Sequence, residues 1–147
     1  MLTRVFSAAI QGVDAVEVEV EVNAGSGEPV MVVVGLPDTS VKESRDRVTT
    51  AIANSGLRWP RSRTTVNLAP ADLKKEGPSF DLPIAIGMIT VAQEAEIPRL
   101  ARCLMAGELA LNGEVRPIKG ALAMALEARR RKKRAILLPA ANARAAA

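Results

Sequence analysis

One serine of this chain stands where a nucleophile is often displayed, in the turn Gly77-Pro78-Ser79 directly before a long apolar segment. A serine hydroxyl needs a general base within hydrogen-bond reach, usually histidine and in a minority of enzymes lysine. The chain contains no histidine. Two interpretations therefore remain. Ser79 is a nucleophile served by Lys75 or Lys119, or it caps the following helix through its hydroxyl, which the Asp81 carboxylate could also do.

Two basic segments have the residue types that bind nucleic-acid phosphates. One is a run of six cations: Arg129, Arg130, Arg131, Lys132, Lys133 and Arg134. The other combines Arg58, Arg61 and Arg63 with Trp59, on which a base could stack. Structural alternatives exist for both, because cations also favour the carboxyl end of a helix and a tryptophan often covers the edge of a core. Either segment would strengthen binding without reading a base sequence.

Composition excludes several other kinds of site. The single cysteine, Cys103, excludes an intrachain disulfide, and without histidine the usual zinc and transition-metal clusters are excluded too. No aspartates are clustered at ligand spacing, so no magnesium or porphyrin site is expected. The net charge of +4 permits contact with phosphates but does not establish it. No secretory signal and no membrane-spanning run is found, so we expect a cytoplasmic protein without a membrane partner.

Several segments along the chain have the sequence patterns of β-strands. Valines alternate with glutamates from Val16 to Val22, which predicts a strand with one buried and one solvated face in an antiparallel sheet. The apolar run 29–35 predicts a second strand, which we expect to form a hairpin with the first across the turn 24–27. Further strands are predicted at 64–68, 104–111, 114–116 and 135–138, with Asn112-Gly113 as a hairpin turn.

Three helices are predicted between these strands. The first begins near Asp38, with a capping box of Ser40 and Glu43 or with Asp38 itself as cap. The second, 80–95, is apolar nearly all round and should be buried on most sides, and the third is 121–131. The 147 residues thus fit a single domain, an α/β (α+β) sandwich. Its expected order is β-β-β-α-β-α-β-β-α-β, which has one strand before the first helix in addition to the ranges above.

Several motifs together resemble a known family. They are Val34–Asp38, Val41–Val48, Thr65–Pro83, Gly107–Leu109 and Gly113–Ile118. These segments are similar to the amino-terminal domain of the ComM/YifB-type, magnesium-chelatase-like AAA+ ATPases, over nearly the whole chain. The resemblance implies the fold of ribosomal protein S5 domain 2, with a mixed sheet and three main helices, which the Lon protease domain and the tail of the RadA recombination factor share.

The same resemblance implies a non-catalytic accessory role. In that family the domain precedes a hexameric ATPase module linked to DNA branch migration during natural transformation. The chain has no Gly-x4-Gly-Lys-Ser/Thr string, so we expect it to be a piece of a larger ATPase and ATP and magnesium to bind outside it. The expected partners are DNA, the protein's own ATPase module and neighbouring subunits.

The likeness to Lon-type peptidases bears directly on Ser79. Those enzymes carry Gly-Pro-Ser at the nucleophile and a lysine shortly after a Pro-Ile segment. Here that lysine position falls on Leu122, with Met124 as a nearby alternative, and neither side chain accepts a proton. A structural Ser79 is therefore favoured. The alternatives are a divergent peptidase that pairs Ser79 with Lys119 or Lys75, and a module that docks a partner at an exposed strand edge.

Overall fold

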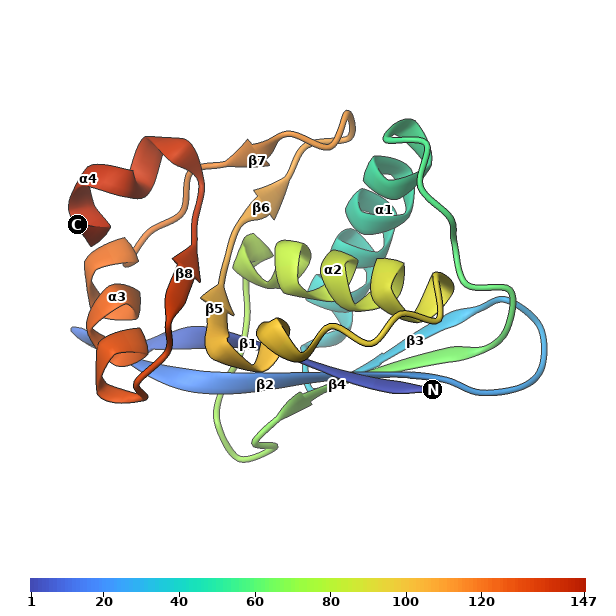
Figure 1. The fold of residues 1–147 in the computed structure, drawn as a ribbon, viewed down its shortest axis with the longest axis horizontal. Coiled ribbons are helices and arrows are strands. Elements are labelled where there is room, and N and C mark those ends of the chain that lie inside the picture. The colour runs from blue at the N-terminus through green and yellow to red at the C-terminus, as the bar shows by residue number, and fades with distance from the viewer.

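The amino-terminal hairpin forms the centre of the main sheet in the computed structural model, which describes residues 1–147 (Figure 1). Strands β1 (Leu2–Gln11) and β2 (Asp14–Ala24) are antiparallel along their whole length, with Leu2 opposite Asn23 and Gln11 opposite Asp14. The six strands lie in the order β3-β4-β2-β1-β5-β8. The other four are β3 (Met31–Val34), β4 (Thr64–Ala69), β5 (Cys103–Met105) and β8 (Ala135–Leu137).

The sheet is mixed, as predicted, but one predicted pairing is wrong. Strand β4 is antiparallel to β2 and parallel to β3, and β5 is parallel to both β1 and β8. The run 29–35 therefore does not form a hairpin with 16–22, because β4 lies between them. Strand β3 leads into a helix that returns to β4, and such a crossover makes the two strands parallel neighbours.

Helices cover both faces of the sheet. The helices are α1 (Asp38–Asn54), α2 (Asp81–Ala92), α3 (Ala121–Arg130) and the short α4 (Ala143–Ala146), with 3₁₀ turns η1 (Pro78–Phe80), η2 (Pro98–Arg102) and η3 (Ala140–Asn142). On β1, Val5 belongs to the core cluster that contains α1 and α2, whereas Ala8 packs with Met124 and Ala128 of α3. Because side chains alternate along a strand, α2 and α3 lie against opposite faces of the sheet.

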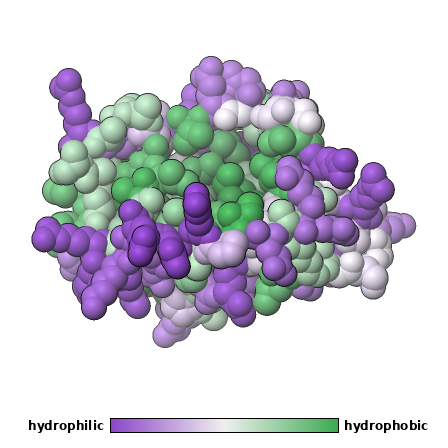
Figure 2. Space-filling model, in the orientation of Figure 1, coloured by the Kyte–Doolittle hydropathy of each residue, from purple (hydrophilic) through white to green (hydrophobic).

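Helix α2 is buried on most sides, as its composition predicts. Eight of its 12 residues are buried: Asp81, Pro83, Ile84, Ala85, Gly87, Met88, Thr90 and Val91. Gly87 approaches β2 so closely that a β-carbon there would clash with Val22. The outer residues Leu82, Ile86 and Ile89 are half-buried, and apolar surface is visible over this part of the molecule in Figure 2.

The predicted strand 104–111 is broken in the structure. After β5, the chain forms β6 (Glu108–Leu109), which pairs with β7 (Val115–Arg116) in a separate two-stranded sheet. The break falls at Gly107, whose N–H donates to the Ser79 carbonyl at 2.8 Å and whose carbonyl accepts from the Leu82 N–H at 3.1 Å. These bonds redirect the backbone away from β1. The predicted turn at Asn112-Gly113 joins β6 and β7.

The predicted side-chain cap of α1 is wrong. Pro37 is the residue before the helix, and no side chain caps it. The Pro37 carbonyl already accepts the N–H of Val41 at 2.9 Å, so Asp38 lies inside the first turn and Ser40 is too far along to cap.

None of the helices in the structure is long and apolar enough to cross a membrane.

Candidate functional site

Backbone contacts, rather than a cap, position Ser79. The residue lies in η1, directly after Gly77, whose φ of 87° is in the left-handed region that favours glycine. Neither η1 nor α2 has a side-chain cap, so the prediction that Ser79 or Asp81 caps the helix is wrong. The bond from Gly107 to the Ser79 carbonyl instead holds the turn against the end of β5. The Ser79 side chain is left half-buried.

Ser79 opens into a cavity of about 500 Å³ between η1, the end of β1 and the start of α3. Its lining includes Ala9, Ile10, Gln11, Lys74, Glu76, Gly77, Pro78, Ser79, Phe80, Glu108, Pro117, Ile118, Lys119 and Met124. Lys119 thus lines the same cavity as Ser79, although no hydrogen bond joins them. From α3, the residue that lines the cavity is the buried Met124, whereas Leu122 is 57% exposed and lines a groove beside α4.

The second lysine proposed for Ser79 is committed elsewhere. Lys75 is only 2% exposed, and its ammonium donates to the carbonyls of Pro70 and, at 2.7 Å, of Leu73. Burial lowers the pKa of Lys75, and the nearby charge of Asp72 opposes this shift only in part. The amine therefore supports the loop after β4 and does not line the cavity.

A buried carboxylate beside the cavity was not predicted as such. Asp81 is 0% exposed, and its oxygens accept from Ser44 Oγ at 2.8 Å, from Arg47 Nε at 2.6 Å and from the Leu109 N–H at 3.1 Å. The hydrogen bond to Asp81 raises the pKa of Arg47 despite partial burial. The signal in the sequence was a lone charge at the start of an otherwise apolar helix, because such a charge requires partners when buried.

Three of the six cations in the run 129–134 have structural partners. Glu127, buried in α3, accepts from the Glu17 N–H at 2.8 Å, from Arg130 Nε at 2.8 Å and from Arg131 Nε at 3.4 Å. Desolvation alone would raise the pKa of Glu127, but these three donors outweigh it and lower the pKa. Lys133 donates to the Ala101 carbonyl at 2.9 Å and lies over the Phe6 ring.

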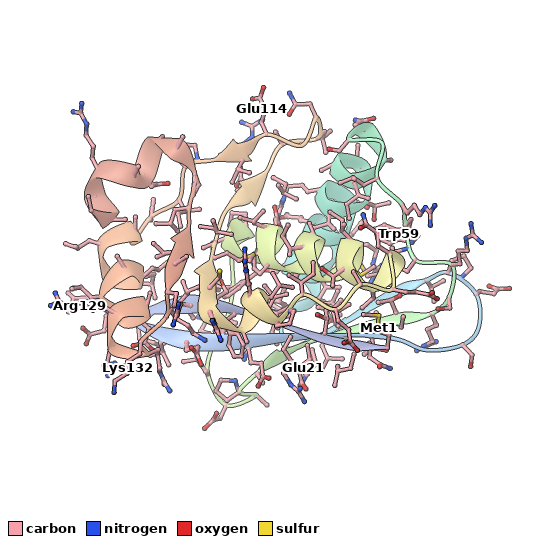
Figure 3. All side chains as sticks on the ribbon, viewed as in Figure 1. Met1, Glu21, Trp59, Glu114, Arg129 and Lys132 are labelled. Carbon is pink, nitrogen blue, oxygen red and sulfur yellow. The ribbon has the colours of Figure 1, made fainter.

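The other three cations are free for a ligand. Arg129, Lys132 and Arg134 are exposed and form no ion pair. Figure 3 shows Arg129 and Lys132 extending outward from the α3 end of the molecule. A phosphate backbone could therefore contact half of the predicted run.

The second basic segment, marked by Trp59 in Figure 3, lies far along the long axis from Arg129 and Lys132 of the first. Arg58, Arg61 and Arg63 are exposed and without ion pairs, but Trp59 is half-buried and packs against the main core. Trp59 thus covers the edge of the core, which leaves less of its ring exposed for stacking on a base. The structure does not bring the two basic segments together into one surface.

No cluster of three or more histidine, cysteine, aspartate or glutamate side chains is arranged to hold a metal ion. The cavity is lined by a serine hydroxyl, lysine ammonium groups and carboxylates, together with apolar side chains. A cavity lined in this way can bind a ligand that has both apolar and polar groups.

Comparison with known proteins gives a consistent result. The model of the family "Subunit ChlI of Mg-chelatase" matches residues 19–142. YifB of Escherichia coli is 46% identical over 127 residues, which cover 86% of this chain and 25% of YifB. The competence protein ComM of Haemophilus influenzae is 43% identical over 136 residues, covering 92% of this chain and 27% of ComM.

A more distant similarity extends to a protease. Lon protease 2 of Thermus thermophilus is 28% identical over 138 residues, covering 89% of this chain and 17% of the protease. The chain therefore spans about a quarter of the length of YifB and ComM and less of Lon. These matches agree with the mixed α/β architecture and with the resemblance noted in the sequence motifs.

Proposed function

This chain belongs to the family of subunit ChlI of Mg-chelatase, and from that premise we propose that it is a non-catalytic accessory domain of a longer, magnesium-chelatase-like AAA+ ATPase. The ATPase acts on DNA, and the domain contributes contacts to DNA or to neighbouring subunits. ATP and magnesium bind in the ATPase module, outside these residues, in a cytoplasmic assembly. The similarity to the competence protein ComM supports this proposal, since natural transformation requires DNA processing.

The side chains near Ser79 carry the non-catalytic part of the proposal. The cavity at Ser79 has a methionine, Met124, on its α3 wall, and the buried Lys75 donates its protons to two backbone carbonyls. Nucleophilic catalysis by serine requires a base that accepts the hydroxyl proton. Neither side chain serves as that base.

A second candidate function rests on the cavity that Ser79 shares with Lys119. If loop motion brings the two together, Lys119 activates Ser79 and the domain is a peptidase. Treatment with a fluorophosphonate probe separates the two functions. We expect no labelling of the chain, and therefore no difference between the natural chain and Ser79→Ala. Labelling that is lost in both Ser79→Ala and Lys119→Met would overturn the accessory role.

The DNA contact is assigned to Arg129, Lys132 and Arg134. Neutralising three phosphates gives a slope of log K against log salt of about −2 to −3, and the contact is independent of base sequence. The test measures fluorescence anisotropy of single-stranded and forked DNA from low to moderate salt. We expect the triple alanine variant to lose this slope, whereas Lys42→Ala, on the exposed face of α1, changes it little. Absence of binding by the natural chain would leave subunit contact as the role.

A further inference from the structure

The parallel strands β1 and β5 separate at the cavity. Strand β1 pairs with β5 at a single position, Phe6 opposite Leu104, although its pairing with β2 continues to Gln11. Beyond Phe6, the β5 side of β1 therefore has no neighbouring strand. Ala9, Ile10 and Gln11, in this last part of β1, line the cavity. An unpaired strand edge presents N–H and C=O groups on which another extended chain can pair.

An apolar pocket lies beside this strand edge. Phe80 and Met124 are each 1% exposed, and both contribute to the cavity wall together with Ile10 and Ile118. The volume of about 500 Å³ is within the range of sites that enclose a ligand group. The side chains of an extended chain on the β1 edge would alternate between the two faces of the sheet. One apolar side chain of such a chain would thus enter the pocket.

The polar groups of the cavity favour an acidic residue in the ligand. Lys119 is exposed and has no acidic partner, whereas Glu108 is 3.8 Å from Arg116. Lys74 and Glu76 are 3.7 Å apart and both highly exposed, so their opposite charges add little net charge to the cavity lining. Ser79 Oγ forms no hydrogen bond with another side chain and is available to a ligand. The uncompensated charge of the lining is therefore that of Lys119.

We propose that this cavity binds an extended peptide segment, which adds to the β1 edge as a strand. An apolar side chain of the peptide occupies the pocket of Phe80 and Met124, and an acidic side chain or terminal carboxylate lies near Lys119. The peptide is bound and not cleaved. This role goes beyond the accessory function and does not depend on it, because it requires only the cavity and the strand edge.

The first experiment uses a defined probe, a fluorescein-labelled nine-residue peptide of alanine and serine with a central leucine followed by aspartate. Titration into the ¹⁵N-labelled chain should shift the amides of Ala9–Gln11, Gly77, Ser79 and Lys119. We expect Lys119→Glu to weaken binding about tenfold, and the matched control Lys42→Glu, on the exposed face of α1, to stay within about twofold. Both positions are exposed, so both variants should fold.

A second probe tests strand addition itself. The same peptide with two alternate amides N-methylated keeps its side chains but loses backbone donors, and it should bind at least about fivefold more weakly. Equal affinity of the two probes would overturn strand addition and leave the cavity as a site for a carboxylate-bearing small molecule. Absence of shifts at millimolar probe, or shifts confined to the groove between α3 and α4, would overturn the proposal as a whole.

Discussion

At the residue scale, buried carboxylates connect the helices of this protein. Asp81 joins Ser44 and Arg47 of α1 to α2 and to the β6 backbone, and Glu127 joins α3 to β2. Each carboxylate is almost completely removed from water. A buried charge costs free energy unless it is fully hydrogen-bonded, so removing either group should leave several donors unsatisfied.

For Asp81, the prediction concerns stability. Asp81→Ala removes the acceptor for Ser44, Arg47 and the Leu109 N–H, and we expect the free energy of unfolding to fall by about 3 kcal/mol. Urea denaturation followed by circular dichroism gives the value. Glu43→Ala is the control, because Glu43 is an exposed partner of Arg47 at 3.8 Å and should cost less than about 0.5 kcal/mol. Equal losses in the two variants would contradict the role of Asp81.

For Glu127, the prediction concerns pH. Its pKa in the folded protein lies below the ordinary 4.5, so the unfolded chain binds the proton more tightly. The stabilisation is therefore fully present above about pH 5.5 and is lost as the pH falls through 4.5 and then through the folded pKa. Urea denaturation should show Glu127→Gln less stable than the natural chain at pH 7, with the gap closing toward pH 3.

The exposed Glu96→Gln serves as the control for that series, since Glu96 forms no ion pair and its substitution should follow the natural chain at every pH. A gap between Glu127→Gln and the natural chain that widens on acidification would contradict the sign of the shift.

Sequence patterns located the site residues better than they assigned their roles. Gly-Pro-Ser identified the turn, and the basic runs identified the exposed cations, because both are local signals. The ion pairs of Arg130 and Arg131 with Glu127 could have been inferred from their spacing on a helix. The contacts of Lys75 and Asp81 could not, since they depend on how loops and helices pack in three dimensions.

At the scale of the elements, close packing of α2 on β2 depends on Gly87. Gly87→Ala would improve the helix propensity by about 1 kcal/mol, but the added methyl clashes with Val22 and overpacking costs about 1–3 kcal/mol. We expect a net loss of stability on thermal or urea denaturation. Gly25→Ala, in the loop after β2, where the added methyl makes only an ordinary contact with the Arg63 carbonyl, should change stability by less than about 1 kcal/mol. A Gly87→Ala protein more stable than the natural chain would show that the contact is not close.

Adjacent lysines at the end of α3 provide another test. Lys133 is 11% exposed, with its ammonium over the Phe6 ring and 3.4 Å from Glu17, whereas Lys132 extends into solvent. Lys133→Ala should lower the free energy of unfolding by about 1–2 kcal/mol. Lys132→Ala should leave stability nearly unchanged and weaken DNA binding. The combination of both measurements on both variants distinguishes packing from ligand contact.

Elements with periodic patterns were predicted well, and their neighbours less well. The Val/Glu alternation gave β2, and the turn at Asn112-Gly113 gave the hairpin of β6 and β7, because these signals are carried by residues close in sequence. The placement of β4 between β2 and β3 was missed, since pairing across 40 residues leaves no local pattern. The break at Gly107 depends on the η1 turn and was missed for the same reason.

At the scale of the whole molecule, the separation of the basic segments determines how they can act. Trp59, in the segment of Arg58, Arg61 and Arg63, lies far along the long axis from Arg129 and Lys132 (Figure 3). Contributions from distant, independent sites add. We expect charge reversal in each basic segment to change the logarithm of the DNA dissociation constant independently. In the variant that combines both reversals, the two changes should add. Fluorescence anisotropy with a short duplex measures all three values. A combined effect much larger than the sum would indicate one continuous contact.

The position of the amino-terminal hairpin also sets an order of assembly. The first 24 residues supply the two middle strands, with their register already fixed by a short turn, before any other part of the sheet has been synthesised. As the nascent chain lengthens, β4 can attach to the β2 side, and β5 and then β8 to the β1 side. The sheet thus has a template before its later strands are made, and each later strand extends an edge that already exists.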